Sequence, residues 1–278
     1  MKKIVLTGAA GRLGSYLREP LTKMADLLVS SDIHDDIGNR YPGEEYQQAD
    51  LASLDDINRL LEGADMVVHF GAIGDEASFD EILGPNIIGA YNIWEAAYRQ
   101  GVRRVVYASS VHAVGMHSRT AGIGIDAAHK PDTYYGLAKC FAEDLASLYW
   151  DKRGVESVCM RIFSCAQVNN ARSLGTWLSY DDLIHLVEQS INTRTTGFAI
   201  VYGVSNNDRS PVDNSKASFL GFRPKDNAEQ FAEEILSDAP AEDINDPAHQ
   251  FLGGPFAAVE IGQSGLATMN VVDDAKKI

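Results

Sequence analysis

KIVLTGAAGRLG, residues 3–14, passes from an apolar run into glycines at the spacing G-x-x-G-x-x-G. The run at 3–7 predicts a buried strand, and a helical pattern of apolar residues follows at 13–21. Glycine permits both a tight turn and a close approach of strand to helix. Because a helix N-terminus presents free N–H groups, such a turn can also hold a pyrophosphate. A plain tight turn would explain the glycines as well, so the surrounding sequence has to decide.

The rest of the first 164 residues repeats this alternation of apolar runs and helical patterns. Strands are predicted at 27–31, 66–70, 104–108 and 157–163, with another before Asp50, and helices at 53–62, 86–99 and 135–153. The apolar runs are continuous, which is typical of parallel strands that are covered on both faces. The sequence therefore predicts an α/β fold with a doubly wound, Rossmann-like parallel sheet.

The alternation weakens after residue 164. Helices are predicted at 180–191 and 226–236, a short strand at 198–202, and polar loops at 167–173 and 205–217. We therefore predict three regions. They are a dinucleotide-binding domain at 1–164, a small carboxyl-terminal substrate-binding annex on the same core at 165–258, and a loose tail at 259–278.

Composition and charge exclude several classes of partner. The chain has 39 acidic and 24 basic residues and a formal charge of −15, so its surface should repel nucleic acid and anionic membranes. The three cysteines, Cys140, Cys159 and Cys165, have no metal-ligand spacing, and no metal site is predicted. No apolar run approaches membrane-spanning length and no signal segment is visible, so we expect a cytoplasmic protein.

An acidic residue at the end of the second predicted strand indicates which dinucleotide binds. Asp32 follows Gly14 by eighteen residues. Its carboxylate can accept hydrogen bonds from both adenosine ribose hydroxyls and would repel a 2′-phosphate, which favours NAD over NADP. A solvated turn aspartate within the run 32–36 remains the alternative.

Other segments are placed to complete the cofactor site. Asp50 and Leu51 should meet the adenine, and the small residues of Phe70-Gly71-Ala72 suit close passage of ribose and pyrophosphate. The remaining predicted cofactor contacts are Gly8, Gly11, Arg12, Leu13, Gly14, Ile33, Tyr135, Lys139 and Ile162.

A tyrosine and a lysine at i and i+4 predict the catalytic chemistry. Tyr135 and Lys139 would be neighbours on one helical face, and Ser110 lies just past the predicted strand 104–108. A phenol is a poor base at neutral pH, but a nearby ammonium and a positive nicotinamide ring both favour phenolate. Lowering that pKa by about three units takes roughly 4 kcal/mol. Ser110 can hydrogen-bond the reacting oxygen, and Lys139 can also hold the nicotinamide ribose.

The same residues resemble the extended short-chain dehydrogenases/reductases, also called NAD-dependent epimerases/dehydratases. The similar strings are TGAAGRLG, DMVVHFGA, NIIGAYNIWEAA, VVYASS and YYGLAK. The resemblance implies an NAD-dependent oxidoreductase. It also makes Asn86 an asparagine that helps organise the active site, although a simple helix-start residue after Pro85 remains possible.

Farther along, the chain is similar to the uronate dehydrogenases of that family, and the resemblance covers about residues 1–255. Its strings are SSVHAVG, YYGLAKCFAEDLA, RIFSC, NNARSLGTWLSYDDL, VYGVSNND and FLGFRPKDNAE. It implies NAD-dependent oxidation of a free uronic acid, D-galacturonate or D-glucuronate, at C1 to an aldarolactone. The substrate contacts that it implies are Gly74, Ser110, Val111, His112, Tyr135, Ser164 and Arg172.

Arg172 would hold the substrate carboxylate, because a guanidinium matches it with two parallel hydrogen bonds. A surface arginine is the alternative. Val111 stands where the family often has asparagine, and Gly74 stands where it has serine, so the sugar preference is open. Asp75 or Ser78 could compensate for the missing serine.

Two other functions share parts of this pattern. A nucleotide-sugar epimerase or dehydratase would use the same catalytic pair but return the hydride, and the short second half counts against it. A non-catalytic NAD-binding regulator could dispense with Tyr135 and Lys139, which are both present. By analogy with relatives, the helices 86–99 and 135–153 could pair between subunits, so we expect a homo-oligomer.

Overall fold

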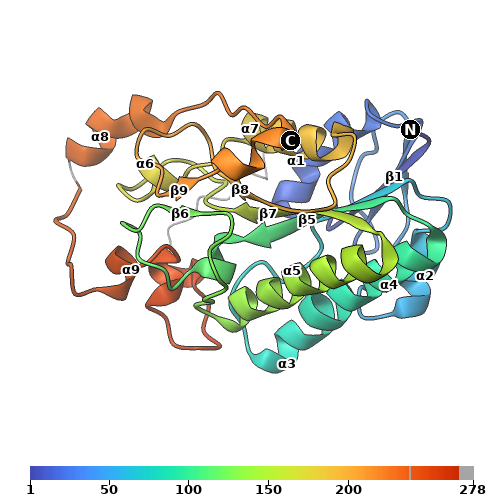
Figure 1. The fold of residues 1–278 in the computed structure, drawn as a ribbon, viewed down its shortest axis with the longest axis horizontal. Helices are drawn as coiled ribbons and strands as arrows, with labels where there is room; N and C mark the ends of the chain where they lie inside the picture. The colour runs from blue at the N-terminus through green and yellow to red at the C-terminus, as the bar shows by residue number, and fades with distance from the viewer. Residues whose placement is uncertain (238, 269–278) are drawn as a thin grey trace.

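The structure is a computed structural model, and it describes residues 1–237 and 239–268. Its centre is a parallel sheet of seven strands in the order β3-β2-β1-β4-β5-β7-β8 (Figure 1). The strands are β1 Lys3–Thr7, β2 Leu27–Ser31, β3 Glu44–Tyr46, β4 Met66–His69, β5 Arg104–Ser110, β7 Glu156–Ile162 and β8 Phe198–Gly203. The predicted doubly wound parallel sheet is confirmed. The strand order reverses between β1 and β4, and in such folds the ligand crevice opens there, at the carboxyl ends of the strands.

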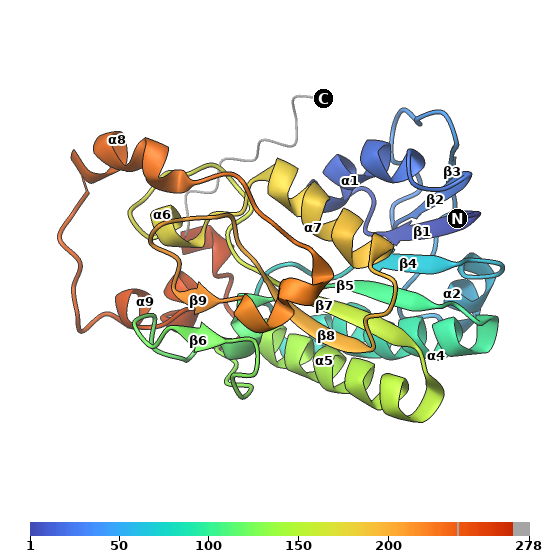
Figure 2. The same ribbon diagram turned by 45° about the horizontal axis from the view of Figure 1, so that its top comes forward.

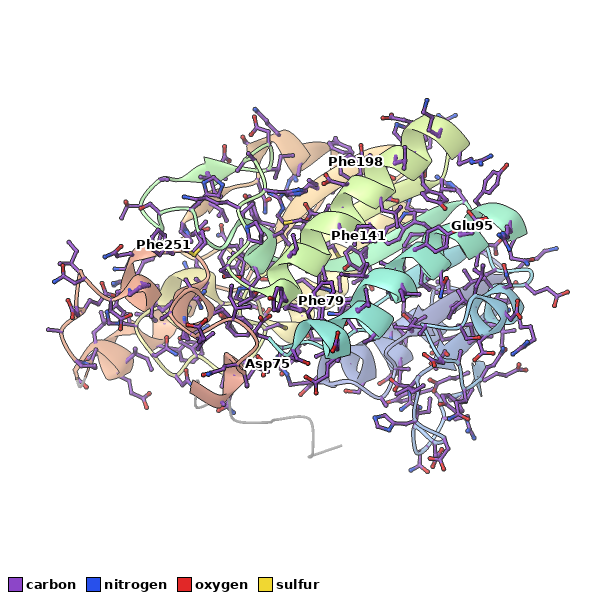
Figure 3. All side chains as sticks on the ribbon, turned by 90° about the horizontal axis from the view of Figure 1, so that it is seen from below. Asp75, Phe79, Glu95, Phe141, Phe198 and Phe251 are labelled. Atoms are coloured by element: carbon purple, nitrogen blue, oxygen red, sulfur yellow. The ribbon has the colours of Figure 1, made fainter. Side chains whose placement is uncertain are left out.

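Helices cover both faces of the sheet (Figure 2). One face carries α1 Arg12–Thr22 and α7 Tyr180–Asn192, and the other carries α2 Leu54–Leu60, α4 Gly89–Gln100 and α5 Tyr134–Arg153. Figure 3 shows Glu95 on α4 and Phe141 on α5, which run side by side across the second face.

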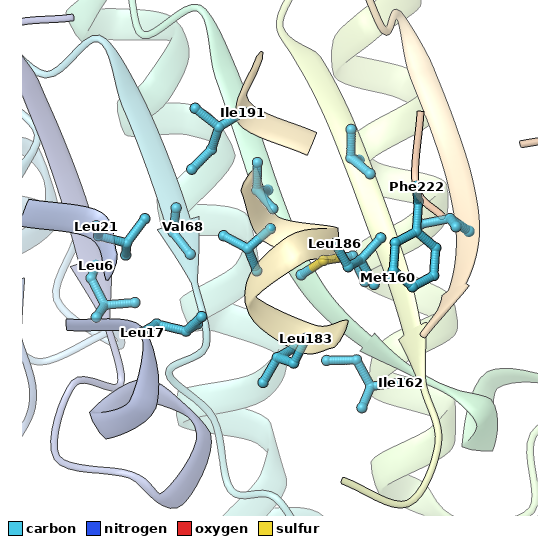
Figure 4. Packing of buried hydrophobic residues seen from close by; sticks show 14 of the residues in the cluster. Leu6, Leu17, Leu21, Val68, Met160, Ile162, Leu183, Leu186, Ile191 and Phe222 are labelled. Atoms are coloured by element: carbon cyan, nitrogen blue, oxygen red, sulfur yellow. The ribbon is translucent and has the colours of Figure 1, made fainter. Parts of the chain in front are cut away.

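Consecutive strand residues are buried on opposite faces, which explains the continuous apolar runs. In β1, Leu6 belongs to the same buried cluster as Leu17 of α1 and Leu186 of α7, and Figure 4 shows this cluster. Val5 belongs to the other cluster, under α2, α4 and α5. Both side chains are 0% exposed, so neither face of the strand has a polar position to create an alternation.

The remaining elements are short, and the sequence patterns did not reveal most of them. Strands β6 Ile123–Gly124 and β9 Val212–Asp213 pair with each other, and the short α-helices are α3 Phe79–Ile82, α6 Ser173–Thr176, α8 Ala232–Ser237 and α9 Pro247–Gln250. The 3-10 helices are Val111–Val114, Ser215–Leu220, Ala228–Phe231, Gly254–Ala257 and Leu266–Thr268. Elements of two to six residues are too short to show a period, so β9 fell within the predicted loop 205–217. The predicted helix 226–236 is divided into the 3-10 turn 228–231 and α8.

The helix predicted at 86–99 begins earlier and is irregular. It is preceded by α3 and by a π-helical stretch, Leu83–Ile88. Pro85 lies inside that stretch and has no N–H to donate, which favours a departure from the regular α-helical hydrogen bonds. Asn86 is therefore not a helix-start residue, but a buried residue of the π-helical turn.

The prediction of a loose tail is wrong for residues 259–268. The N–H of Gly262 donates to Glu76 at 2.9 Å, and the N–H of Leu266 donates to Asp75 at 3.1 Å. These partners lie 186 and 191 residues away along the chain, so no local pattern could reveal them. The rest of the predicted tail, 269–278, lies outside the described residues. Among the helices that the structure describes, none is long and apolar enough to span a membrane.

Candidate active site

A cavity of about 430 Å³ lies at the carboxyl ends of the central strands. It brings together most of the predicted site residues: Gly8, Gly11, Arg12, Leu13, Gly14, Phe70, Ala72, Gly74, Ser110, Val111, His112, Tyr135, Lys139, Ile162, Ser164 and Arg172. The predicted residues that do not line it are Asp32, Ile33, Asp50, Leu51 and Gly71. A larger hollow of about 740 Å³ includes Arg172 but neither the glycine turn nor Tyr135, so the predicted cofactor and catalytic residues lie together only in the smaller of these two cavities.

The glycine turn is sterically required and leaves a helix end open. Gly8 has φ +73°, and a Cβ on Gly14 would lie 2.0 Å from the carbonyl oxygen of Gly8. The N-cap of α1 is Gly11, and no side chain caps this helix. Its first N–H groups can therefore meet a phosphate without displacing a capping group. Gly71 has a packing role instead, because a Cβ on Gly71 would lie 2.9 Å from Cδ1 of Leu51 and 3.2 Å from Oγ1 of Thr7.

Asp32 follows β2 and lies beside this turn. Its carboxylate accepts the N–H of Ala10 at 2.9 Å and that of Ile33 at 2.9 Å. The side chain of Ile33 is mostly exposed, at 57%. An acidic group fixed against the glycine turn fits an adenosine ribose and opposes a 2′-phosphate.

Asp50 and Leu51 follow β3 and face different surroundings. Asp50 is exposed and accepts the N–H of Ala52 at 2.8 Å. Leu51 packs against the chain at Gly71, where a Cβ would meet its side chain at 2.9 Å. Their assignment to the adenine remains a prediction.

Tyr135 and Ser110 meet in the cavity. Ser110 is the last residue of β5, because the strand runs two residues beyond its predicted end. Tyr135 is the second residue of α5, whose N-cap Thr133 accepts the N–H of Gly136 at 3.0 Å. Both side chains line the cavity, and Ser110 lies close enough to Tyr135 to oppose the effect of burial on the pKa of its phenol.

Lys139 is buried next to this pair. Its ammonium donates to the carbonyl oxygen of Ala108 at 2.6 Å and lies 5.2 Å from the ring centroid of Tyr135. Burial lowers the pKa of Lys139 to about 7, although the carboxylate of Glu143 opposes the shift.

The protein alone does not lower the pKa of Tyr135. Burial raises it to about 12, with Ser110 opposing and the charges of Asp132 and Asp75 adding to the rise. Lys139 alone therefore does not produce the predicted depression of this pKa. The reason is that burial disfavours the charged form of both groups, phenolate and ammonium alike.

His112 is held in the cavity wall by residues that the sequence analysis missed. Its Nδ1 lies 2.8 Å from a carboxylate oxygen of Asp132, whose side chain is fully buried. Its ring stacks on Phe256, with centroids 4.0 Å apart and planes inclined by 24°. Phe256 follows Gly253-Gly254-Pro255, a turn signal that could have drawn attention to this segment.

Arg172 brings a cation into the same cavity without a balancing anion. Its guanidinium donates to the carbonyl oxygen of Leu252 at 2.7 Å and to the hydroxyl of Ser164 at 3.2 Å. Within the described part of the chain, no carboxylate forms an ion pair with it. Burial lowers the pKa of Arg172 to about 10. A desolvated cation with only neutral partners is suited to bind an anion.

The two departures from the family pattern differ in the space around them. Val111 is 3% exposed and begins a 3-10 turn. A Cβ on Gly74 would meet nothing within 4 Å. Neither proposed substitute for a serine at position 74 has a free side chain: Ser78 caps α3 together with Glu81, and Asp75 accepts four hydrogen bonds.

Comparisons with known proteins agree with this geometry. The model of the NAD dependent epimerase/dehydratase family matches residues 4–170. A uronate dehydrogenase from Pseudomonas putida is 44% identical over 92% of this chain and 95% of its own. The crystal structure of uronate dehydrogenase from Agrobacterium tumefaciens has a TM-score of 0.90 at 43% identity, over 95% of this chain and 99% of that one. A mutant of that enzyme complexed with NAD has a TM-score of 0.89 at 42% identity, over 94% and 98%.

Proposed function

The chain belongs to the NAD-dependent epimerase/dehydratase family as an NAD-dependent dehydrogenase, and from this premise we propose that it oxidises a free hexuronate. The substrate is D-galacturonate or D-glucuronate in its cyclic form. The reaction takes place at C1, and the product is the aldarolactone. Relatives that are called uronate dehydrogenases and match 93% or more of their own length support this choice.

The observation that carries the proposal is the guanidinium of Arg172. It lines the same cavity as Tyr135 and Lys139 and has no carboxylate partner among the described residues. A hexuronate carries its carboxylate across the ring from C1. Binding that group to Arg172 therefore directs C1 toward Tyr135, and an uncharged sugar would leave the buried cation uncompensated.

The cofactor residues fit NAD. The open N-terminus of α1 and the glycine turn would hold its pyrophosphate, and Asp32 would hold its adenosine ribose. When bound, NAD⁺ supplies a hydride acceptor and a positively charged ring.

Two side chains of the protein act on the anomeric hydroxyl, and a third supports them. Tyr135 takes its proton as general base, and Ser110 hydrogen-bonds the same oxygen. Lys139 adds positive charge beside the phenol. The pKa of Tyr135 is about 12, so forming its phenolate near pH 7 requires roughly 7 kcal/mol of stabilisation. The charge of Lys139 and that of the bound cofactor must therefore act together.

The experiment is an absorbance assay at 340 nm with NAD⁺ and a panel of free sugars, free hexuronates and UDP-sugars. We expect NADH formation with the two hexuronates and far less with neutral hexoses. A lactone should appear in the same reaction by NMR. The proposal fails if free hexuronates give no NADH. Turnover of UDP-sugars without net NADH would identify an epimerase instead.

A further inference from the structure

Glu76 is a buried carboxylate at the N-terminus of the helix that carries Tyr135. It is 2% exposed and forms no ion pair with any described residue. Its oxygens accept the N–H of Tyr134 at 3.1 Å and that of Tyr135 at 2.8 Å. These N–H groups belong to the first turn of α5 and have no partner within the helix. They and the positive end of the helix dipole stabilise a charge that would otherwise be costly to bury.

The same loop also binds a distant part of the chain, which we call the 262–266 segment. Glu76 accepts the N–H of Gly262 at 2.9 Å. Its neighbour Asp75 accepts three further hydrogen bonds from the segment. They come from the hydroxyl of Ser264 and from the N–H groups of Gly265, at 3.0 Å, and Leu266, at 3.1 Å.

The 262–266 segment is part of the cavity wall. Leu266 and Phe256 line the cavity together with Tyr135. Gly265 lies directly against Phe256, because a Cβ on this glycine would be 2.4 Å from the ring. Releasing the segment would therefore open the side of the cavity on which Tyr135 lies.

Hydrogen bonds from the π-helical turn hold the loop that carries Asp75, which is labelled in Figure 3. The amide of the buried Asn86 accepts the N–H of Ile73 at 2.9 Å and donates to the carbonyl oxygen of the same residue at 2.9 Å. This pair of hydrogen bonds ties the π-helical turn to the residues just before Asp75 and Glu76. Asn86 therefore holds the backbone next to the two residues that carry these carboxylates.

We propose that Asp75 and Glu76 form a clamp that positions Tyr135 and holds the 262–266 segment as a wall of the cofactor cavity. Glu76 hydrogen-bonds both α5 and the segment, whereas Asp75 hydrogen-bonds the segment but not α5 and also lines the cavity. Both act as positioning residues. The inference rests on the proposed function only in taking Tyr135 as the base.

The test compares Glu76→Gln and Asp75→Asn with Glu81→Gln. Glu81 is the exposed capping carboxylate of α3, and the hydrogen bonds that its side chain accepts come from Ser78, so it is a matched control. Amide hydrogen exchange of the intact protein reports on peptides that contain 134–136 and 262–266. NAD affinity from fluorescence titration and kcat at saturating NAD⁺ report on the cavity.

Glu76→Gln should accelerate exchange in both peptides and lower kcat by about tenfold, since an ångström-scale misplacement of a catalytic group can lower the rate by up to about 100-fold. Asp75→Asn should accelerate exchange only in 262–266 and weaken NAD binding. Glu81→Gln should match the wild type throughout. If Glu76→Gln does not fold, Glu76→Asp, which keeps the charge but shortens the reach, should give the same pattern more weakly.

Wild-type exchange in both peptides of a Glu76 variant, or an unchanged kcat, would overturn the clamp. So would loss of protection in 134–136 upon Asp75→Asn. If the wild-type protein oxidises no hexuronate, the proposed function fails, but the exchange and NAD-binding measurements still decide on the clamp.

Discussion

Burial shifts the pKa values of two side chains in the cavity in opposite directions. The pKa of Tyr135 is raised to about 12 and that of Lys139 is lowered to about 7, because each loses the solvation of its charged form. At neutral pH, the protein by itself therefore favours a neutral phenol. We therefore expect the base form to depend on the additional positive charge of the bound cofactor, which would couple ionisation of Tyr135 to NAD⁺ binding.

Replacing the phenol tests the assignment of the base. Tyr135→Phe keeps the ring in the cavity and removes only the hydroxyl, so kcat should fall by about 10³-fold, within the usual range for general base catalysis. NAD affinity should stay close to that of the wild type. Steady-state assays and fluorescence titration measure the two quantities. Tyr134→Phe, one residue away and outside the cavity lining, is the control and should keep its activity.

Removing the cation tests the substrate class. Arg172→Ala should lower kcat/KM for galacturonate by about 100-fold, because a charge-assisted pair in a desolvated site contributes roughly 3 kcal/mol. The weak oxidation of galactose should change much less, since that sugar has no carboxylate. Arg209→Ala, which breaks an exposed pair with Glu229, is the matched control. An equal loss for both sugars would assign Arg172 to folding instead of recognition.

At the residue scale, the sequence predicts best where chemistry and spacing coincide. Gly8, Gly14, Tyr135 and Lys139 belong to two short motifs, and a helical turn or a tight turn fixes their geometry. Asp132 and Phe256 hold His112, but they reach it only after the chain has folded back. No local spacing relates such residues.

At the element scale, the core strands were predictable because burial on both faces selects continuous apolar runs. The ends of the helices and strands were less predictable. β5 extends to Ser110, although Ser109 and Ser110 are polar, because both serines are buried and pair in register with β7. The π-helical turn before α4 likewise departs from the regular period on which a helix prediction depends.

One buried network joins α5 to the sheet. Glu143 on α5 is 0% exposed, and its carboxylate lies 2.8 Å from Arg161 on β7 and 2.8 Å from His129. Ser109 on β5 also donates to it. Burial opposes ionisation, but these hydrogen bonds and the charge of Arg161 hold the pKa of Glu143 below its usual value.

Glu143→Gln should lower the free energy of unfolding by about 3 kcal/mol, because it leaves the guanidinium of Arg161 buried without its anion. Since the folded pKa of Glu143 is depressed, its ionic contribution is present above the unfolded pKa and is lost as the pH falls through the folded pKa. The difference between wild type and variant in urea unfolding should therefore be full at pH 7 and shrink in acid. Asp144→Asn replaces the exposed carboxylate next to Glu143 and should change the free energy of unfolding only slightly. A pH-independent difference would contradict this account.

At the scale of the whole molecule, the order of the strands places the site. From the switch point, the strand order continues through β2 and β3 on one side and through β5, β7 and β8 on the other. Because β1, β4 and β5 are parallel, the loops that follow them lie at the same end of the sheet and bring the glycine turn, the Asp75 loop and Ser110 together. The alternation of strands and helices predicted this edge. It did not predict that residues 262–266 would close it, because that contact joins residues that lie 186 to 191 positions apart in the sequence.

The outer surface of α3, α4 and α5 carries apolar side chains that a monomer would leave in water. Tyr91, Tyr98, Leu137, Phe141 and Leu148 are each 38–51% exposed, and Figure 3 shows Phe79 and Phe141 on this face. Such a patch is typical of an interface, which agrees with the homo-oligomer expected from the sequence.

We expect light scattering after size-exclusion chromatography to give at least a dimer. Leu148→Glu should shift the mass toward 30.3 kDa by placing a charge in the patch, whereas Leu236→Glu on α8 should not. A wild-type protein that elutes as a monomer at micromolar concentration would leave this face without a partner copy and refute the expectation.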